Sequence, residues 1–97
     1  MNSKIDQFRI VINMRVADGF METGNLFIGS DKDAAIKLFS ELEGKSDVST
    51  SSLLRLDLKE HAEGMDVLWH SLECSLSEMG DNMKMITKET FRLLNLE

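Results

Sequence analysis

The sequence lacks the features that three common classes of protein need: disulfide-bonded proteins, secreted or membrane-spanning proteins, and proteins that bind nucleic acid. Among its 97 residues it has one cysteine, Cys74, which permits no internal disulfide. It has no long apolar run, since Arg9, Asn13 and Arg15 interrupt the most apolar opening stretch, and we expect neither a secretory signal nor a membrane span. It has 11 Lys and Arg against 17 Asp and Glu, and the net charge of -6 has the wrong sign for binding a phosphate backbone. We therefore expect a cytoplasmic protein that binds neither nucleic acid nor membranes.

The chain does have the composition of a folded domain. Hydrophobic residues make up 42% of it and charged residues 29%, which is above the apolar content at which chains stay disordered. Single cores hold about 100 to 150 residues, so a chain of this length can bury one core and not two. We expect residues 1–97 to form a single α+β domain, in which residues 1–7 are a loose N-terminal lead-in.

The first hairpin is indicated by an alternating segment and the turn that follows it. Over residues 8–16 every second residue is apolar, which is the period of a half-buried strand. The Asp-Gly pair at 18–19 suits the two positive-φ positions of a type I′ turn. A hairpin about that turn would place Arg15 opposite Glu22, an opposite-charge pair across the two strands.

The second strand and the helix after it carry their own signals. A bulge near residues 24–25 would decide whether Phe27 or its two apolar neighbours face the core, and the pattern leaves that open. The Ser30 hydroxyl is expected to cap a helix. Apolar residues at three- and four-residue spacing over 35–42 predict its buried face, and Gly44 ends it.

The second half of the chain needs two observations to interpret. Residues 53–60 alternate and predict a third strand, but the segment after it fits a strand as well as a helix. An S-x-x-E capping box from Ser75 to Glu78 starts a helix at Ser75. We therefore predict a strand over 66–73 and a helix over 76–95. The turn between the two strands would then pair one apolar face with another, Leu54, Leu56 and Leu58 with Leu72, His70 and Leu68.

The predicted order is strand, strand, helix, strand, strand, helix. Both halves follow one plan, a hairpin followed by a serine cap and a helix, although too few residues are identical to indicate a duplication. The apolar face of each strand needs cover, and two amphipathic helices supply it. The fold class that we expect is α+β: a two-layer sandwich with ββαββα order, in which a four-stranded antiparallel sheet carries both helices on one face.

His70 and Cys74 are the first candidates for chemistry. They are four residues apart, a spacing that lets a helix share a metal between them but that separates them by about 13 Å on a strand. The predicted strand argues against a shared site, and a histidine among leucines is more often a packed core residue. The helix amides after Cys74 would lower the pKa of an exposed thiol, whereas a buried apolar thiol is the more common case.

Acidic residues gather between positions 60 and 81. This segment holds six acids and no Lys or Arg. Glu60, Glu63 and Asp66 surround His61 near the second turn, where they could hold a divalent cation weakly or face a basic partner. The spacing of a calcium loop is absent, which favours an ordinary solvated turn. We predict no catalytic residue, no metal and no cofactor, and the candidate ligand or metal residues are His61, Glu63, Asp66, His70 and Cys74.

Trp69 is the residue that points to a function. If the helices cover the even-numbered side of the strands, the other side of the sheet exposes Val11, Val67 and Trp69. An apolar centre with a charged rim is typical of an interface, because aromatic residues anchor many of them. The alternative is that charged neighbours lie across the indole and shield it. The charged rim consists of Arg15, Glu22, Arg55, Asp57, Lys59 and Glu73.

These observations favour one hypothesis over a rival of a different class. The leading hypothesis is a non-enzymatic protein-interaction or self-associating module that uses the sheet face around Trp69. Unpaired edge strands offer a second route to a homodimer. The rival is a small-molecule or metal-binding protein, or a minor enzyme, that uses His70, Cys74 and the acids near His61.

Overall fold

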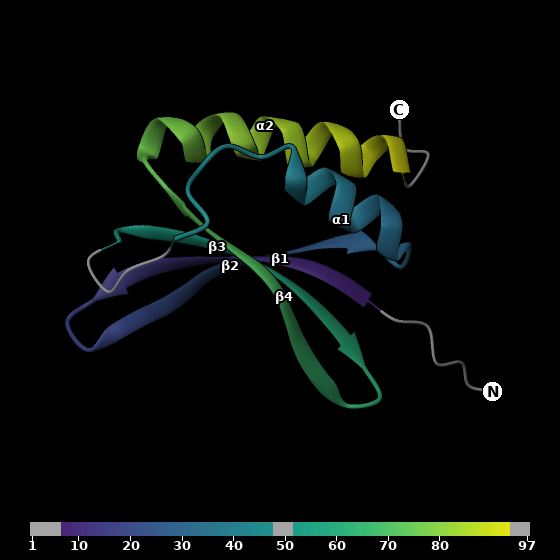
Figure 1. The fold of residues 1–97 in the computed structure, drawn as a ribbon, viewed down its shortest axis with the longest axis horizontal. Coiled ribbons are helices and arrows are strands. Elements are labelled where there is room, and N and C mark those ends of the chain that lie inside the picture. The colour runs from purple at the N-terminus through teal and green to yellow at the C-terminus, as the bar shows by residue number, and fades with distance from the viewer. Residues whose placement is uncertain (1–6, 48–51, 94–97) are drawn as a thin grey trace.

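The structure, a computed structural model, describes residues 7–47 and 52–93 of the chain (Figure 1). Its elements follow the order ββαββα, so the predicted order and the α+β class are confirmed. The elements are β1 (Gln7–Val16), β2 (Gly19–Gly29), α1 (Lys32–Ser40), β3 (Leu54–Ala62), β4 (Met65–Cys74) and α2 (Leu76–Leu93).

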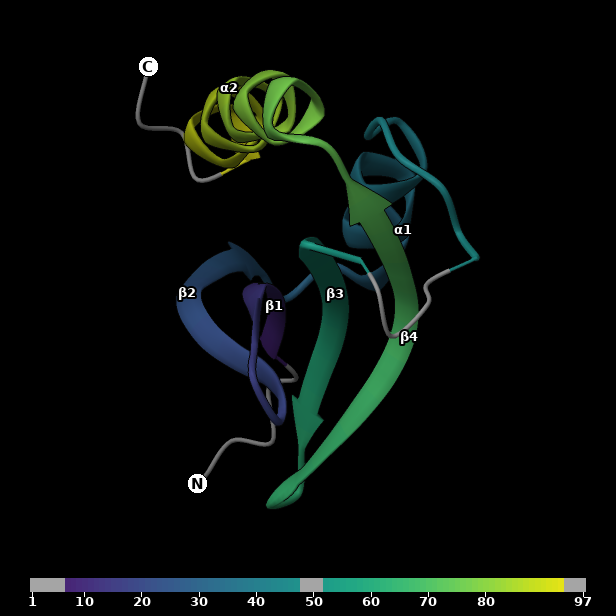
Figure 2. The same cartoon turned by 90° about the vertical axis from the view of Figure 1, so that its left-hand side faces the viewer.

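The four strands form one antiparallel sheet in the order β2-β1-β3-β4. The first strands of the two hairpins, β1 and β3, are therefore central in the sheet. The second strands, β2 and β4, are its edges. Both helices lie on the same side of the strongly twisted sheet, as Figure 2 shows. The predicted two-layer arrangement with one covered face is confirmed.

The core lies between the helices and one face of the sheet. Alternation dictates which residues of the central strands reach it, because successive side chains point to opposite faces. Ile10 on β1 and Leu56 and Leu58 on β3 have no exposed surface. The rest of the buried core cluster is Phe8, Ile28, Ala35, Leu38, Phe39, Leu42, Leu54, Cys74 and Ile86.

The first hairpin has a different register from the predicted one. Val16 pairs with Gly19, so the two loop residues are Ala17 and Asp18 and not the predicted Asp18 and Gly19, and Arg15 lies opposite Phe20. The predicted pair of Arg15 with Glu22 is wrong. Register shifts along the hairpin then bring Ile28 to the core and leave Phe27 41% exposed, which answers the question of which residue of β2 faces inward.

The second hairpin closes with the turn type expected of the first. Glu63 and Gly64 both have positive φ, 53° and 80°, between the paired residues Ala62 and Met65. The predicted register of this hairpin is also wrong by two residues. The observed pairs are Leu54 with Cys74, Leu56 with Leu72 and Leu58 with His70.

The helix starts are set by side-chain caps. At α1 the cap is Asp31, whose carboxylate accepts from the Ala34 amide at 3.1 Å, and not Ser30 as predicted. At α2 the predicted capping box is confirmed, since Ser75 and Glu78 each accept the other's backbone amide. Leu76, the first residue of α2, is 80% exposed.

Parts of two predictions fall outside the described residues. In the predicted lead-in, residues 1–6 are not described, and Gln7 already begins β1. The predicted end of the last helix at residue 95 likewise lies beyond Leu93, the last described residue. In the part of the chain that is described, neither helix combines the length and the apolar character that crossing a membrane needs.

Candidate functional site

Trp69 lies on the helix-covered side of the sheet, not on the open side as predicted. The pairing of β3 with β4 shifts by one residue after Leu58, so that Trp69 and His70 together stand opposite it. Such a bulge reverses the alternation of the residues on one side of it. The indole packs against the core cluster, and the Lys32 ammonium at the start of α1 lies 4.3 Å from its ring centroid.

Trp69 is also held by a hydrogen bond within the chain. Its indole N–H donates to the Glu60 carboxylate at 3.0 Å, and Glu60 is only 9% exposed. A buried carboxylate needs a donor, because an unpaired buried charge is strongly unfavourable. The Trp69 ring therefore links β3, β4 and the start of α1.

The other two predicted interface residues also differ from expectation. Val67 pairs with Glu60 beyond the bulge, which puts it on the helix side, where it is 42% exposed. Val11 does lie on the open side, between Asn25 and Asp57, but it is 3% exposed and offers no surface to a partner. The expected open apolar face made of these residues is thus absent from the described part of the sheet.

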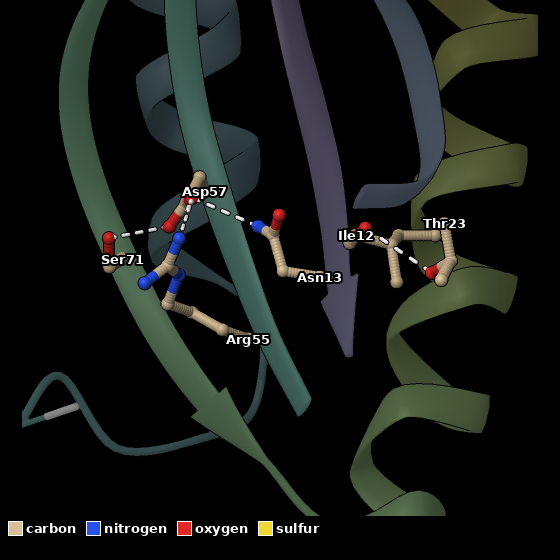
Figure 3. Close-up of polar contacts among 6 residues, drawn as sticks. All are labelled: Ile12, Asn13, Thr23, Arg55, Asp57 and Ser71. Carbon is tan, nitrogen blue, oxygen red and sulfur yellow. Dashed lines mark hydrogen bonds and ion pairs between the residues drawn. The ribbon is translucent and has the colours of Figure 1, made fainter. Parts of the chain in front are cut away.

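The open side of the sheet carries a buried polar cluster instead. Asp57, at the centre of β3, is 1% exposed. Its carboxylate accepts from the Asn13 amide at 3.0 Å and from the Ser71 hydroxyl at 2.6 Å. The Arg55 guanidinium lies 3.1 Å away, as Figure 3 shows. The Asp57 carboxylate is therefore satisfied within the chain, by the Asn13 amide, the Ser71 hydroxyl and the Arg55 guanidinium. We interpret this cluster as a structural hydrogen-bond network.

Aromatic rings on β2 cover parts of this open side. The guanidinium of Arg55 lies 4.4 Å from the Phe20 ring centroid, and that of Arg9 lies 5.6 Å from the Phe27 ring centroid. Such stacking shields apolar rings with long charged side chains. Of the charged residues that the sequence analysis placed around Trp69, Arg55 thus lies against Phe20 of the first hairpin.

The candidate ligand residues near the second turn form a pair and not a cluster. The Nδ1 atom of His61 lies 2.7 Å from the Asp66 carboxylate, and both side chains are about half exposed or more. Glu63 sits in the turn itself, with positive φ. Within residues 7–47 and 52–93, no three His, Cys, Asp or Glu side chains gather closely enough to hold a metal ion.

His70 belongs to a small apolar cavity. Its ring stacks on Phe39 of α1, with centroids 6.2 Å apart and planes inclined by 16°. The cavity between α1, the segment after it and β4 has a volume of about 210 Å³. Its walls are Ile36, Phe39, Ser40, Leu42, Ser46, His70, Ser71 and Leu72.

Cys74 faces a different part of the molecule. It is 3% exposed, and its thiol donates to the Glu43 carbonyl at 3.4 Å. Burial, with the charge of nearby Glu78, raises the pKa of the thiol to about 11. The helix start after it does not activate it, and Cys74 shares no cavity wall with His70.

Along β4, the free edge of the sheet and the His70 cavity lie together. At its end, Glu73 exchanges two backbone hydrogen bonds with Lys45, of 2.9 and 2.7 Å. From Met65 to Leu72, β4 has no partner on its outer edge among the described residues. The turn end of this hairpin also lies far from both helices (Figures 1 and 2).

Two important residues were not singled out by the sequence patterns. Asp57 alternates with leucines and has the pattern of a solvated strand residue. Asn82 is 2% exposed, and its side-chain amide exchanges hydrogen bonds with both backbone groups of Glu43, at 2.7 and 2.8 Å. A signal existed for Asn82, because it falls at core spacing between Met79 and Ile86.

Comparisons with protein-family models, with curated proteins and with solved structures found no match to this chain. A fold by itself does not determine a function, because unrelated functions occur on the same fold. What the protein does must therefore be inferred from its own residues and their geometry.

Proposed function

We propose that the protein is a non-enzymatic protein-interaction module that binds an extended segment of a partner protein along the free edge of β4, next to Trp69. One observation carries this proposal. Among the residues that the structure describes, the stretch from Met65 to Leu72 has no partner on its outer edge, and it runs beside an apolar cavity of about 210 Å³ that β4 shares with α1. An edge strand with an adjoining pocket is the arrangement used for strand addition.

Strand addition uses both backbone and side chains. The outward N–H and C=O groups of an edge strand pair with the backbone of the incoming segment, which supplies affinity. Alternate side chains of that segment then meet the two sides of the sheet. On β4 these sides carry exposed apolar residues, among them Val67 at 42%, Leu68 at 56% and Met65 at 66%.

The cavity suits one aliphatic side chain of such a segment. Pockets for whole small molecules usually measure about 300 to 1,000 Å³, and this one is smaller. Its walls are mainly Ile36, Phe39, Leu42 and Leu72. A leucine or valine of the partner would bury apolar surface there, at roughly 25 cal/mol per Å².

Charge indicates the character of the other side chains. Glu63 and Asp66 are exposed at the turn end of the hairpin, and residues 60–81 contain six acids without Lys or Arg. Opposite charges across paired strands are favourable, while like charges repel. The partner segment is therefore expected to alternate apolar with basic or neutral residues, with a basic residue near Asp66.

A peptide selection tests the proposal. Random ten-residue peptides displayed on phage are selected against the purified protein, and the recovered peptides are synthesised and titrated by calorimetry. We expect peptides with alternating apolar residues and a basic end. We expect Ser40→Phe, which fills the cavity from an exposed position, to weaken binding about tenfold or more. The control Thr87→Phe, beside another cavity, should leave it unchanged.

Hydrogen exchange locates the bound peptide independently. Outward amides of β4 between Met65 and Leu72 should exchange more slowly with peptide bound, whereas amides of β2 should not change. Failure to recover any binding peptide would contradict the proposal. So would equal affinity in the wild type and Ser40→Phe, or protection along β2.

The alternative function, a small-molecule-binding protein, has one observation in its favour. His70, Ser40 and Ser46 are polar residues that line this mainly apolar cavity, and a few polar groups in an apolar pocket can orient a ligand. A fragment screen by thermal shift discriminates the two. A fragment that stabilises the wild type but not Ser40→Phe, in the absence of peptide binding, would favour this alternative.

A further inference from the structure

We propose that the open face of the sheet carries a binding site for one phosphate group, formed by Arg9 near the start of β1 and Lys59 near the end of β3. The site lies on the side of the sheet away from the helices (Figure 2), whereas the cavity beside His70 lies between α1 and β4. The proposal therefore does not rest on the function proposed above, and it assigns a ligand to a different surface.

The pairing of the two central strands brings the two cationic residues together. Arg9 stands directly opposite Lys59, and the row that they form continues with Phe27 on β2 and Leu68 on β4. Phe8, the residue before Arg9, belongs to the core, so alternation directs this row to the open face. Residues that face each other on paired strands have Cβ atoms about 4.5 to 5.5 Å apart. One small anion can therefore contact both side chains.

Arg9 and Lys59 form an unfavourable pair when no ligand is bound. Like charges directly opposite each other on paired strands repel and lower the stability of the sheet. Among residues 7–47 and 52–93, neither side chain forms an ion pair with a carboxylate. The middle of the sheet thus keeps two unbalanced positive charges in a chain whose net charge is -6. An anion bound between them would remove this repulsion.

The Arg9 guanidinium is held in place by neutral groups. Its Nη2 atom donates to the Gln7 side-chain oxygen at 3.0 Å, and its Nη1 atom donates to the Asn25 side-chain oxygen at 3.3 Å. It also lies over the Phe27 ring. These partners orient the guanidinium without balancing its charge, and they use two of its five N–H donors. Arg9 is therefore oriented in advance, with donors left for an anion, which lowers the cost of binding.

Four acids of the strands share the open face, and each is bonded to another residue. Asp57 belongs to the polar cluster described above, where Arg55 balances its charge. The other three are Glu22, Asp66 and Glu73, bonded to Asn25, His61 and Ser52 in that order. None of the four lies in the row of Arg9 and Lys59, whose two ends are apolar.

The two positive charges select a dianion with several oxygen atoms. A phosphate monoester carries a charge of about -1.5 to -2 at pH 7 and has three acceptor oxygens. It can therefore balance both cations and accept from the guanidinium and the ammonium together, whereas a single carboxylate balances one of them. Two cations suit one phosphate and not a phosphate backbone, for which the net charge has the wrong sign. The ligand class is thus a phosphate monoester, carried by a small molecule or by a phosphorylated side chain.

A titration followed by NMR of the backbone amides tests the site. Inorganic phosphate, O-phosphoserine and adenosine monophosphate are each added to the purified protein, with sodium chloride at the same ionic strength as the control. We expect shifts centred on Arg9 and Lys59, with a dissociation constant of about 1 mM for the tightest of the three. Arg9→Gln and Lys59→Gln should each weaken binding about fivefold or more. Arg15→Gln removes the same charge six positions further along β1 and should leave binding unchanged.

Thermal unfolding supplies a readout that a merely structural role for Lys59 would not give. In a buffer without phosphate, Lys59→Gln removes the repulsion with Arg9, so its melting temperature should equal or exceed that of the wild type. Adding phosphate should raise the melting temperature of the wild type, because the ligand binds the folded state. The same addition should not raise that of Lys59→Gln.

The three ligands distinguish the source of the phosphate. Tighter binding of O-phosphoserine would support a phosphorylated side chain as the ligand, and tighter binding of the nucleotide would support a small molecule. Equal shifts with sodium chloride would overturn the proposal, because the site would then respond to any anion. Equal weakening by Arg15→Gln would overturn it too, as would a Lys59→Gln variant that is less stable than the wild type without phosphate.

Discussion

β2 and β4 have equivalent positions in the fold but different surroundings. Each is the second strand of a hairpin, each leads into a helix, and each forms one edge of the sheet. The end of β4 is covered, because Lys45 pairs with Glu73 and Asn82 holds the adjacent Glu43. Among the described residues, the edge of β2 has no such covering segment. It borders a groove between β2 and α2 instead.

This difference shows that the connecting segments determine how far an edge strand is covered and which charges lie beside it. The chain leaving α1 passes along β4 before it enters β3, and so it closes part of one edge and forms a wall of the His70 cavity. The acids of the second hairpin then separate the two edges in charge. A repeated ββα pattern thus produces two sheet edges with different surroundings.

The largest expected effect comes from removing the residue that fixes the covered end of β4. Asn82→Ala deletes both side-chain hydrogen bonds to Glu43 and leaves a void at a position that is only 2% exposed, which together should lower the free energy of unfolding by about 3 kcal/mol. Urea denaturation measures it. Asn25→Ala, whose bonds are exposed, should change stability by less than about 0.5 kcal/mol. Equal effects would show that the two edges are held alike.

A smaller effect is expected at the bulge of β4. Trp69→Phe keeps most of the ring but removes the donor to the buried Glu60 carboxylate, which should cost about 2 kcal/mol. Adding Glu60→Leu removes the buried charge as well, so the double variant should regain part of that loss. Guanidinium unfolding of the single and double variants checks this. If the double variant were less stable than the single, Glu60 would have another essential donor.

The smallest effect concerns Cys74 at the end of β4, and it depends on pH. Because the fold raises the thiol pKa from 9.0 to about 11, it favours the neutral thiol. Its contribution to stability is fully present below pH 9 and is lost as the pH rises toward 11. Urea midpoints measured from pH 8 to pH 11 should fall more steeply for the wild type than for Cys74→Ala. Parallel curves would mean that Cys74 titrates normally.

The sequence predicted the elements better than it predicted the faces. The alternation in β1 and β3 and the Ser75 to Glu78 capping box each depend on residues close together in the chain, and the structure confirms them. The side on which Trp69 lies depends on a one-residue bulge opposite Leu58. No local pattern marks that bulge, and one residue is enough to reverse every face beyond it.

The candidate site shows the same limit. His70 was a sequence candidate, but the cavity beside it requires α1 to lie against β4, which is a long-range contact. Asp57 has the pattern of a surface residue, since only the pairing of three strands brings Asn13 and Ser71 to its carboxylate. Asn82 could have been found, because a polar residue on an apolar helix stripe usually has a buried partner.

The polar cluster around Asp57 also determines how the strands align. The leucines of β3 repeat every two residues, so sliding β4 by two would still place apolar residues against them. Hydrophobic burial alone therefore cannot choose between these alignments. In the observed one Asp57 lies opposite Ser71, whereas a slip of two residues would set it opposite Trp69 or against the like charge of Glu73. A single carboxylate on the open side of the sheet thus selects one alignment for a core that would accept several.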